Sequence, residues 1–267
     1  MILLMGGTSE SVTIAGALAQ AGYPVLVSMA TEVPLALHDL PGICLRRGRL
    51  NRDELTALIR QHSIAALVDA THPFALEAHE TAVAAAREAG VPYLRWLRPP
   101  SDLSGYQHLH FAGDHEDAAR VATAFAQPIL LTIGSKNLQP YVSEARRAGL
   151  SLFARVLPCE DAQLACREAA LDPEDVIFAR GPFSTEDTLR LLRERHIGVL
   201  VTKESGAAGG VPEKLQACAI ANCACVVVRR AGSEPTAGCS SISELLAMLA
   251  THGLAAVSTI VSRGLHE

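Results

Sequence analysis

The sequence predicts an α/β protein of two Rossmann-like domains with mainly parallel sheets and an interdomain cleft. Short β-branched or leucine-rich runs alternate with alanine-rich segments of helical period along most of the 267 residues. The first such run leads straight into the glycine pair Gly6 and Gly7, and Pro99 with Pro100 divides the alternation into two series. Alternation of this kind is typical of parallel strands with helices on both faces of the sheet.

The first domain is expected to span residues 1–98 and to bind a dinucleotide. Asn51 and Glu54 have the spacing of a capping box, which predicts a helix that continues to Gln61, and Gly90 stops the next helix. The strands are predicted at residues 2–5, 25–29, 43–46, 64–69 and near Tyr93, and the other helices at 9–20 and 74–89.

The second domain is expected to span residues 99–253 and to bind the substrate, and residues 254–267 form a tail of unknown structure. Its last helix is predicted to begin after Ser241, which lies three residues before Glu244, and to run to about residue 250. The strands are predicted near 107–111, 129–133, 151–156, 176–179, 198–202 and 224–228. The other helices are predicted near 114–125, 138–148, 161–169, 185–195 and 212–221.

Composition excludes several classes of protein. The net charge of −5 and the pI near 6.1 argue against a nucleic-acid partner. No stretch is long and apolar enough to cross a bilayer, and the apolar start of the chain lacks the basic leader of a signal peptide. The seven cysteines contain no CxxC pair, so we expect reduced thiols in the cytoplasm and no metal site. The sequence makes no prediction of oligomeric state.

The turn after the first strand is the strongest local signal. Gly6 and Gly7 let the backbone approach a pyrophosphate, the following helix offers free N–H groups, and Thr8 and Ser9 add hydroxyl donors. The spacing differs from GxGxxG, and the alternative is a tight turn without a ligand. The position at the first strand–helix junction favours a dinucleotide.

The ends of the next two strands favour NADPH over NADH. The second strand ends near Ser28 without an acid that could hold a ribose diol, and Arg46, Arg47 and Gly48 end the third strand. A guanidinium and a small hydroxyl suit a 2′-phosphate, whereas the alternative is a solvated basic turn.

The loop after the fourth strand also lies at the carboxyl edge of the sheet, where ligands bind. It supplies Asp69, Thr71, His72 and Pro73 as candidate cofactor contacts. His79, on the helix that follows, is interpreted as a surface or packing residue.

Three polar loops follow strands of the second domain. They combine glycines with cations or hydroxyls and suit a substrate rich in carboxylates. The candidate substrate-binding residues are Arg98, Ser135, Lys136, Arg180, Lys203, Glu204, Ser205 and Gly206. No acid–base dyad is evident, so the catalytic residue stays unassigned.

Taken in order, these segments resemble the precorrin-6A reductase family of cobalamin biosynthesis. The resemblance rests on LMGGTSE at 4–10, RG at 47–48, DATHPF at 69–74, LRWLRP at 94–99, TIGSK at 132–136, ARGPF at 179–183 and TKESG at 202–206. It implies two α/β domains and hydride transfer from NADPH to the C18–C19 double bond of precorrin-6A, a tetrapyrrole. The family also implies an alternative, an NADH-dependent reductase of cobalt-precorrin-6A.

Two other classes of enzyme fit less well. No tyrosine is followed by lysine at the spacing of a short-chain dehydrogenase, and a methyltransferase would need an acid on the second strand. A non-catalytic nicotinamide-binding sensor stays open as a remote alternative.

Overall fold

The computed structural model describes residues 1–8, 10–30, 41–99, 101–103, 105–206, 209–230 and 238–254. The chain divides into two compact units. One comprises Met1–Arg98 with Ser233–Glu267, and the other is Pro99–Gly232. The chain therefore passes from one unit to the other twice. The predicted tail, 254–267, lies outside the described residues except for Leu254.

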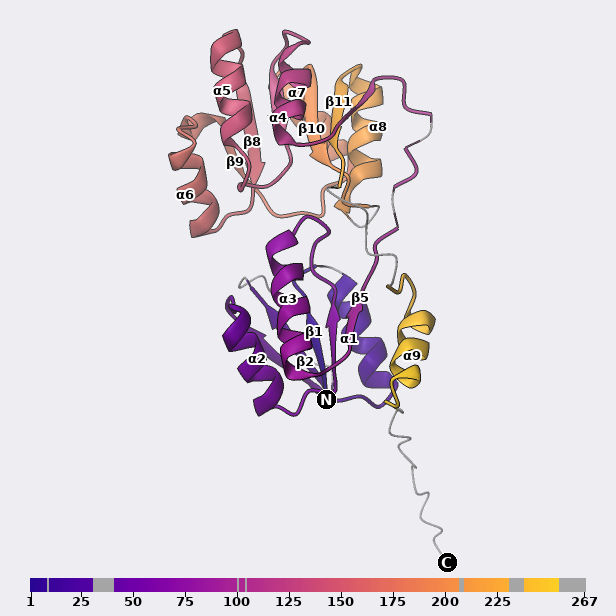
Figure 1. Ribbon diagram of the computed structural model, residues 1–267. Helices are drawn as coiled ribbons and strands as arrows, with labels where there is room; N and C mark the ends of the chain where they lie inside the picture. The colour runs from indigo at the N-terminus through magenta and orange to yellow at the C-terminus, as the bar shows by residue number, and fades with distance from the viewer. Residues whose placement is uncertain are drawn as a thin grey trace, which may run out of the picture. The chain divides into compact units, whose positions relative to one another are not determined.

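The first unit is built on a five-stranded sheet in which every neighbouring pair is parallel, with the order β3-β2-β1-β4-β5 (Figure 1). The strands are β1 (Ile2–Met5), β2 (Val25–Met29), β3 (Ile43–Arg47), β4 (Ala66–Asp69) and β5 (Tyr93–Arg95). The helices are α1 (Glu10–Gln20), α2 (Arg52–Gln61), α3 (Leu76–Ala89) and α9 (Ile242–Thr251). Alternate strand residues form two apolar cores, one with α1 and α9 and one with α2 and α3.

Local signals fix the ends of these helices. The side chain of Asn51 accepts from the Glu54 N–H and that of Glu54 accepts from the Asn51 N–H, so the predicted capping box of α2 is present. Gly90 ends α3 in the left-handed conformation with φ of 71°, which glycine adopts without strain.

Helix α9 packs on the first unit beside α1, although the sequence placed it at the end of the second domain (Figure 1). Leu245 and Leu249 are fully buried in the core that α1 also lines. Just before the helix, the backbone of Cys239 pairs with that of Trp96 in an isolated β-bridge, and the Cys239 N–H donates to the Arg95 carbonyl at 2.9 Å. The predicted boundary was wrong here because a linear assignment joins a helix to the domain that precedes it.

The second unit contains a six-stranded parallel sheet in the order β6-β11-β10-β7-β8-β9. Its strands are β6 (Leu109–Ala112), β7 (Ile129–Leu131), β8 (Leu152–Val156), β9 (Val176–Phe178), β10 (Val199–Lys203) and β11 (Ala224–Val228). Its helices are α4 (His115–Thr123), α5 (Gln139–Ala148), α6 (Glu160–Glu168), α7 (Thr185–Glu194) and α8 (Val211–Ala221), with the short 3-10 helix η1 (Pro173–Asp175).

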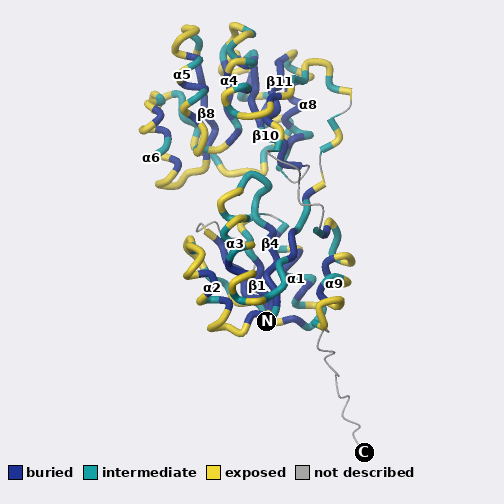
Figure 2. Tube along the Cα trace, viewed as in Figure 1, coloured by how far each residue is buried: buried dark blue, intermediate teal, exposed yellow. Residues whose placement is uncertain are grey.

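Burial follows the layers of each unit, with dark strands between helices that are exposed on their outer faces (Figure 2). The predicted fold class, two α/β units with parallel sheets, is confirmed. Among the described helices, none combines the length and the apolar character of a membrane span.

Candidate active site

The turn between β1 and α1 begins with the glycine pair of the predicted dinucleotide site. A Cβ atom on Gly6 would lie 2.9 Å from Ser11 Oγ, so a larger residue there would force Ser11 to move. Gly7 has φ of 111°, and a Cβ atom on it would meet nothing within 4 Å. The turn is therefore open at Gly7, beside the N-terminus of α1, where an anion is favoured. Ser9 lies outside the described residues.

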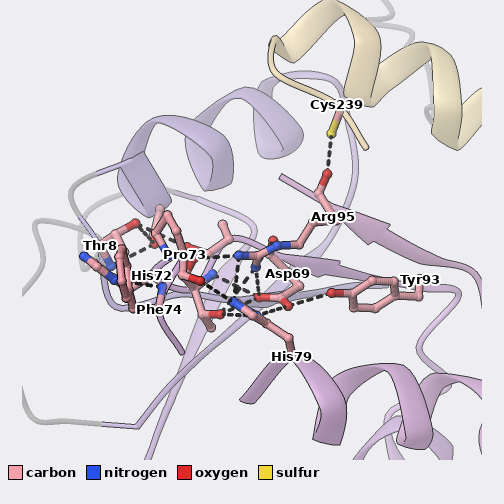
Figure 3. A network of polar contacts seen from close by, with 12 residues as sticks. Thr8, Asp69, His72, Pro73, Phe74, His79, Tyr93, Arg95 and Cys239 are labelled. Atoms are coloured by element: carbon pink, nitrogen blue, oxygen red, sulfur yellow. Dashed lines mark hydrogen bonds and ion pairs between the residues drawn. The ribbon is translucent and has the colours of Figure 1, made fainter. Parts of the chain in front are cut away.

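Thr8 is held in place by its neighbours. Its N–H donates to Ser11 Oγ at 3.2 Å, and its hydroxyl donates to the Ala70 carbonyl at 3.3 Å. The second contact ties the glycine turn to the loop after β4, so that two of the predicted cofactor segments lie side by side (Figure 3).

The two arginines at the end of β3 have different surroundings. The Arg46 guanidinium donates to Ser28 Oγ at 3.4 Å and to the Gly48 carbonyl, so it organises the turn. Gly48 has φ of 104°, and its N–H donates to the Met29 carbonyl at 2.9 Å. Arg47, the next residue, is exposed. Ser28 and Arg46 are thus in contact, while Arg47 is the more exposed of the two arginines.

Asp69, at the end of β4, is the centre of a buried polar network (Figure 3). Its side chain is fully buried, so it does not reach a ligand directly, and we assign it a positioning role instead of the predicted cofactor contact. Its carboxylate accepts from the Thr71 N–H (3.0 Å), Thr71 Oγ1 (2.7 Å), Arg95 Nη1 (2.8 Å), His79 Nδ1 (2.9 Å) and Tyr93 OH (2.8 Å).

These partners stabilise the charged form of Asp69. Burial by itself raises the pKa of this carboxyl, but hydrogen bonding from His79 and the charge of Arg95 outweigh it and lower the pKa to about 2. Burial and the nearby carboxylate of Asp69 raise the pKa of Tyr93, which keeps this phenol protonated as a donor.

The network also fixes the tautomer of His79. Arg95 Nη2 lies 2.9 Å from His79 Nε2 and can only donate, so Nε2 accepts and Nδ1 carries the proton that is donated to Asp69. The imidazole of His79 thus joins α3 to the ends of β4 and β5. His72 and Pro73, in the loop above this network, are half-buried, and the Phe74 N–H donates to His72 Nδ1 at 3.2 Å.

Arg98 lies in the first unit and pairs with Glu10, the first residue of α1. Its side chain is only 6% exposed. The pairing joins Arg98 to the start of α1, beside the glycine turn, and the predicted contact of Arg98 with a substrate stays a prediction.

In the second unit, cations gather on one face of the carboxyl edge of the sheet. Burial, followed by the charge of Lys136, lowers the pKa of Lys203 to about 8. Burial and the charge of Lys203 lower the pKa of His115, whose Nδ1 lies 2.9 Å from the hydroxyl of Tyr141. The predicted residues Lys136 and Lys203 are therefore neighbours, and the sequence had not indicated that His115 and Tyr141 would join them.

The other predicted residues of this unit divide into exposed and buried ones. Arg180 is exposed and Ser135 is half-buried, whereas Ser205 and Gly206 are buried. Arg180 follows β9, which lies two strands from β7 in the sheet, so it is about 10 Å along the edge from the loop of Ser135 and Lys136.

Glu204 is buried and fully engaged within its own unit. Its Oε1 accepts from the N–H groups of Ser101 (3.1 Å) and Gly206 (3.2 Å), and its Oε2 pairs with Arg230 Nε at 2.9 Å. This carboxylate therefore joins the loop after β10 to Ser101 and Arg230, near the two ends of the second unit. Because its oxygens are used in this way, the predicted contact of Glu204 with a substrate is not supported.

The comparison with known proteins assigns the family. The model described as "Precorrin-6x reductase CbiJ/CobK" matches residues 1–250. The chain belongs to this precorrin-6x reductase family. The family is one of reductases, which makes the chain an oxidoreductase.

Relatives in this family carry two kinds of name. The "Cobalt-precorrin-6A reductase" of Priestia megaterium is 35% identical over 81% of this chain and 85% of its own length. The "Precorrin-6A reductase" of Rhodococcus erythropolis is 34% identical over 88% and 90%. A solved "CobK precorrin-6A reductase" is 25% identical, with a TM-score of 0.77 over 96% of this chain and 98% of its own.

In this member of the family, His79 was not predicted from the sequence to contact Asp69. It was interpreted as a surface or packing residue, but its side chain is 16% exposed and bonds to Asp69. The sequence did contain a signal for its burial. His79 comes before Ala82 and Ala86 at the spacing that places residues on one face of a helix, and both alanines are buried. Arg95 and Tyr93 alternate along β5, which would have placed them on one face.

Proposed function

We propose that this protein reduces the C18–C19 double bond of precorrin-6A with a hydride from NADPH in the cytoplasm. Membership of the precorrin-6x reductase family is the observation that carries the proposal. The relatives include enzymes named for the substrate with and without cobalt, at nearly equal identity. The NADH-dependent reduction of cobalt-precorrin-6A is therefore the second candidate.

The residues of the first unit fit a dinucleotide. The open backbone at Gly7 and the start of α1 would hold the pyrophosphate, with Gly6 and Thr8 shaping the turn. His72, Pro73 and Thr71 would line the site from the loop after β4, which the network of Asp69 holds in place. When bound, the reduced nicotinamide supplies the hydride.

Three residues support NADPH over NADH. Ser28 is the residue before the end of β2, and no carboxylate follows it in the described residues Met29 and Ala30. Arg46 braces the turn after β3, beside the exposed Arg47. A guanidinium beside a hydroxyl suits a 2′-phosphate.

The second unit would bind the carboxylates of the tetrapyrrole. Lys136, Lys203 and Arg180 lie along its carboxyl edge, with Ser135 as a hydroxyl donor. A conjugated ring delocalises the electron pair that it receives, so positioning contributes more to the reaction than an acid–base pair.

The test is oxidation of the nicotinamide, followed by its absorbance. The purified protein is mixed with NADPH or NADH and with precorrin-6A that contains or lacks cobalt. We expect the fastest oxidation with NADPH and the metal-free substrate. Faster turnover of NADH with the cobalt form would support the second candidate, and cofactor binding without turnover of either substrate would support the sensor.

A further inference from the structure

Arg155 is a cation inside a sheet, where arginine is rarely found without a partner. It lies in β8, is 7% exposed, and its Nη2 atom is buried without a hydrogen-bond partner. Within the described residues, no carboxylate lies within ion-pair distance of Arg155. A buried guanidinium of this kind is unfavourable for folding unless another group satisfies it.

The surroundings of Arg155 hold its guanidinium in one orientation. The guanidinium carbon lies 3.8 Å from the ring centre of Phe183, so the aromatic ring covers one face of the group. Stacking uses the face of a guanidinium, whereas the N–H donors lie in its plane. The contact therefore orients the fork without satisfying Nη2.

Lys214 adds a second buried cation. It lies on α8, is 8% exposed, and its Nζ donates to the carbonyls of Gly209 (2.8 Å) and Gly210 (3.1 Å). An ammonium has three donors, so one is left after these two bonds. Helix α8 begins at Val211, and its N-cap Gly210 provides no side chain to cap the first N–H groups.

Charge in this region is positive and poorly compensated. Burial, and then the charge of Arg155, lowers the pKa of Lys214 to about 8, and burial lowers the pKa of Arg155 to about 10. Two acids lie near. The Asp187 carboxylate accepts from Ser184, the N-cap residue of α7. Oε2 of Glu213 is buried without a hydrogen-bond partner, and Glu213 makes no ion pair with either cation.

The pleat of the sheet separates this region from Lys203. Phe153 and Leu200 belong to the core that α7 and α8 cover, so Arg155 projects to that face. Lys203 is three residues after Leu200 and projects to the opposite face, towards α4. The same edge of the sheet therefore has cations on both faces.

We propose that Arg155 and Lys214 form a carboxylate-binding subsite, which takes an acetate or propionate side chain of the tetrapyrrole on the face opposite Lys136 and Lys203. This inference rests on the proposed function for the identity of the ligand. The bound carboxylate would satisfy Nη2 of Arg155 and the remaining donor of Lys214.

The test is binding of uroporphyrin, a stable porphyrin that carries acetate and propionate side chains, measured by its fluorescence. We expect Arg155→Met to weaken binding roughly tenfold or more, the loss of a charge-assisted hydrogen bond. The same variant should have a higher Tm, because it removes a buried charge without a partner. Arg155→Lys should recover part of the affinity, and Arg120→Met, at an exposed position on α4, should change neither measurement.

Other outcomes overturn the subsite. A lower Tm with unchanged uroporphyrin affinity would make Arg155 a packing residue for Phe183. Weaker binding of NADPH with unchanged uroporphyrin affinity would assign the cations to a phosphate. Binding is measured without turnover, so an inactive protein that binds uroporphyrin through Arg155 would contradict the proposed function and leave the subsite intact.

Discussion

Arg46 and Arg47 follow one another in β3 but have different surroundings. The guanidinium of Arg46 is used by Ser28 and by carbonyls of its own turn, whereas Arg47 is exposed. If Arg47 binds the 2′-phosphate, Arg47→Ala should weaken the binding of NADPH roughly tenfold or more, since a hydrogen bond to a charged group contributes about 1.5–3 kcal/mol. The affinity for NADH should hardly change. Titration of each cofactor by fluorescence measures both values.

Arg60→Ala provides the matched control, because Arg60 is a surface residue of α2 with a side chain 61% exposed. It should leave both affinities unchanged. If Arg47→Ala lowered the affinities for NADPH and NADH equally, a role of Arg47 at the 2′-phosphate would be refuted.

Asp69 links the stability of the protein to pH. Its pKa is lowered from 3.8 to about 2 in the folded state, so its contribution is fully present above pH 3.8 and is lost as the pH falls through about 2. The shift corresponds to about 2 kcal/mol of unfolding free energy. Asp69→Asn should lack this pH dependence and, at neutral pH, should lose about 3–5 kcal/mol because Arg95 keeps a buried charge without its partner.

Denaturant unfolding at a series of pH values from about 5 to about 2 measures the unfolding free energy of the wild type and of Asp69→Asn. Asp53→Asn is the control, since that side chain is 81% exposed on α2. If Asp69→Asn followed the wild-type pH dependence, the network would not hold the charged carboxylate.

At the scale of elements, periodicity and caps predicted the strands and helices well. Most strands contain a short apolar run, and Asn51, Ser184 and Gly90 act within one helical turn, so their effects can be read locally. The partners of Asp69 could not be read in this way, because His79, Tyr93 and Arg95 come from other elements. The burial of Glu204 likewise depends on Ser101 and Arg230, which are remote in sequence.

Helix α9 shows the same limit for a whole element. Its Ser241 cap is local and was predicted, but its packing partner is α1, more than 200 residues earlier in the chain. Leu249→Ala should therefore destabilise the first unit by about 2–5 kcal/mol, through lost burial and the cavity that is left. Denaturant unfolding followed by the fluorescence of Trp96, the single tryptophan, reports on this unit.

Ile220→Ala is the control for that truncation. Ile220 is 52% exposed on α8 of the second unit, so its loss should cost no more than about 0.5 kcal/mol. An equally small effect of Leu249→Ala would mean that α9 is not part of the folded first unit.

For the whole molecule, the second unit is inserted into the chain of the first. The chain enters it at Pro99 and leaves it near Gly232, and Glu204 binds a residue close to each of these points. One buried carboxylate thus fastens both ends of the insertion to the loop after β10. The contacts of Ser101 and Arg230 with the same carboxylate keep the entry and the exit of the inserted unit close together.

Two variants of Glu204 separate its charge from its hydrogen bonds. Glu204→Gln keeps an acceptor for Ser101 and Gly206 but removes the charge facing Arg230, whose side chain is 11% exposed, and should cost about 3–5 kcal/mol. Glu204→Ala should cost more and should speed amide hydrogen exchange at Ser101 and Gly206, which stay protected in Glu204→Gln. Glu88→Gln, in a surface ion pair of α3, should cost at most about 1 kcal/mol. Unchanged exchange at Ser101 in Glu204→Ala would show that the entry to the second unit is held by other contacts.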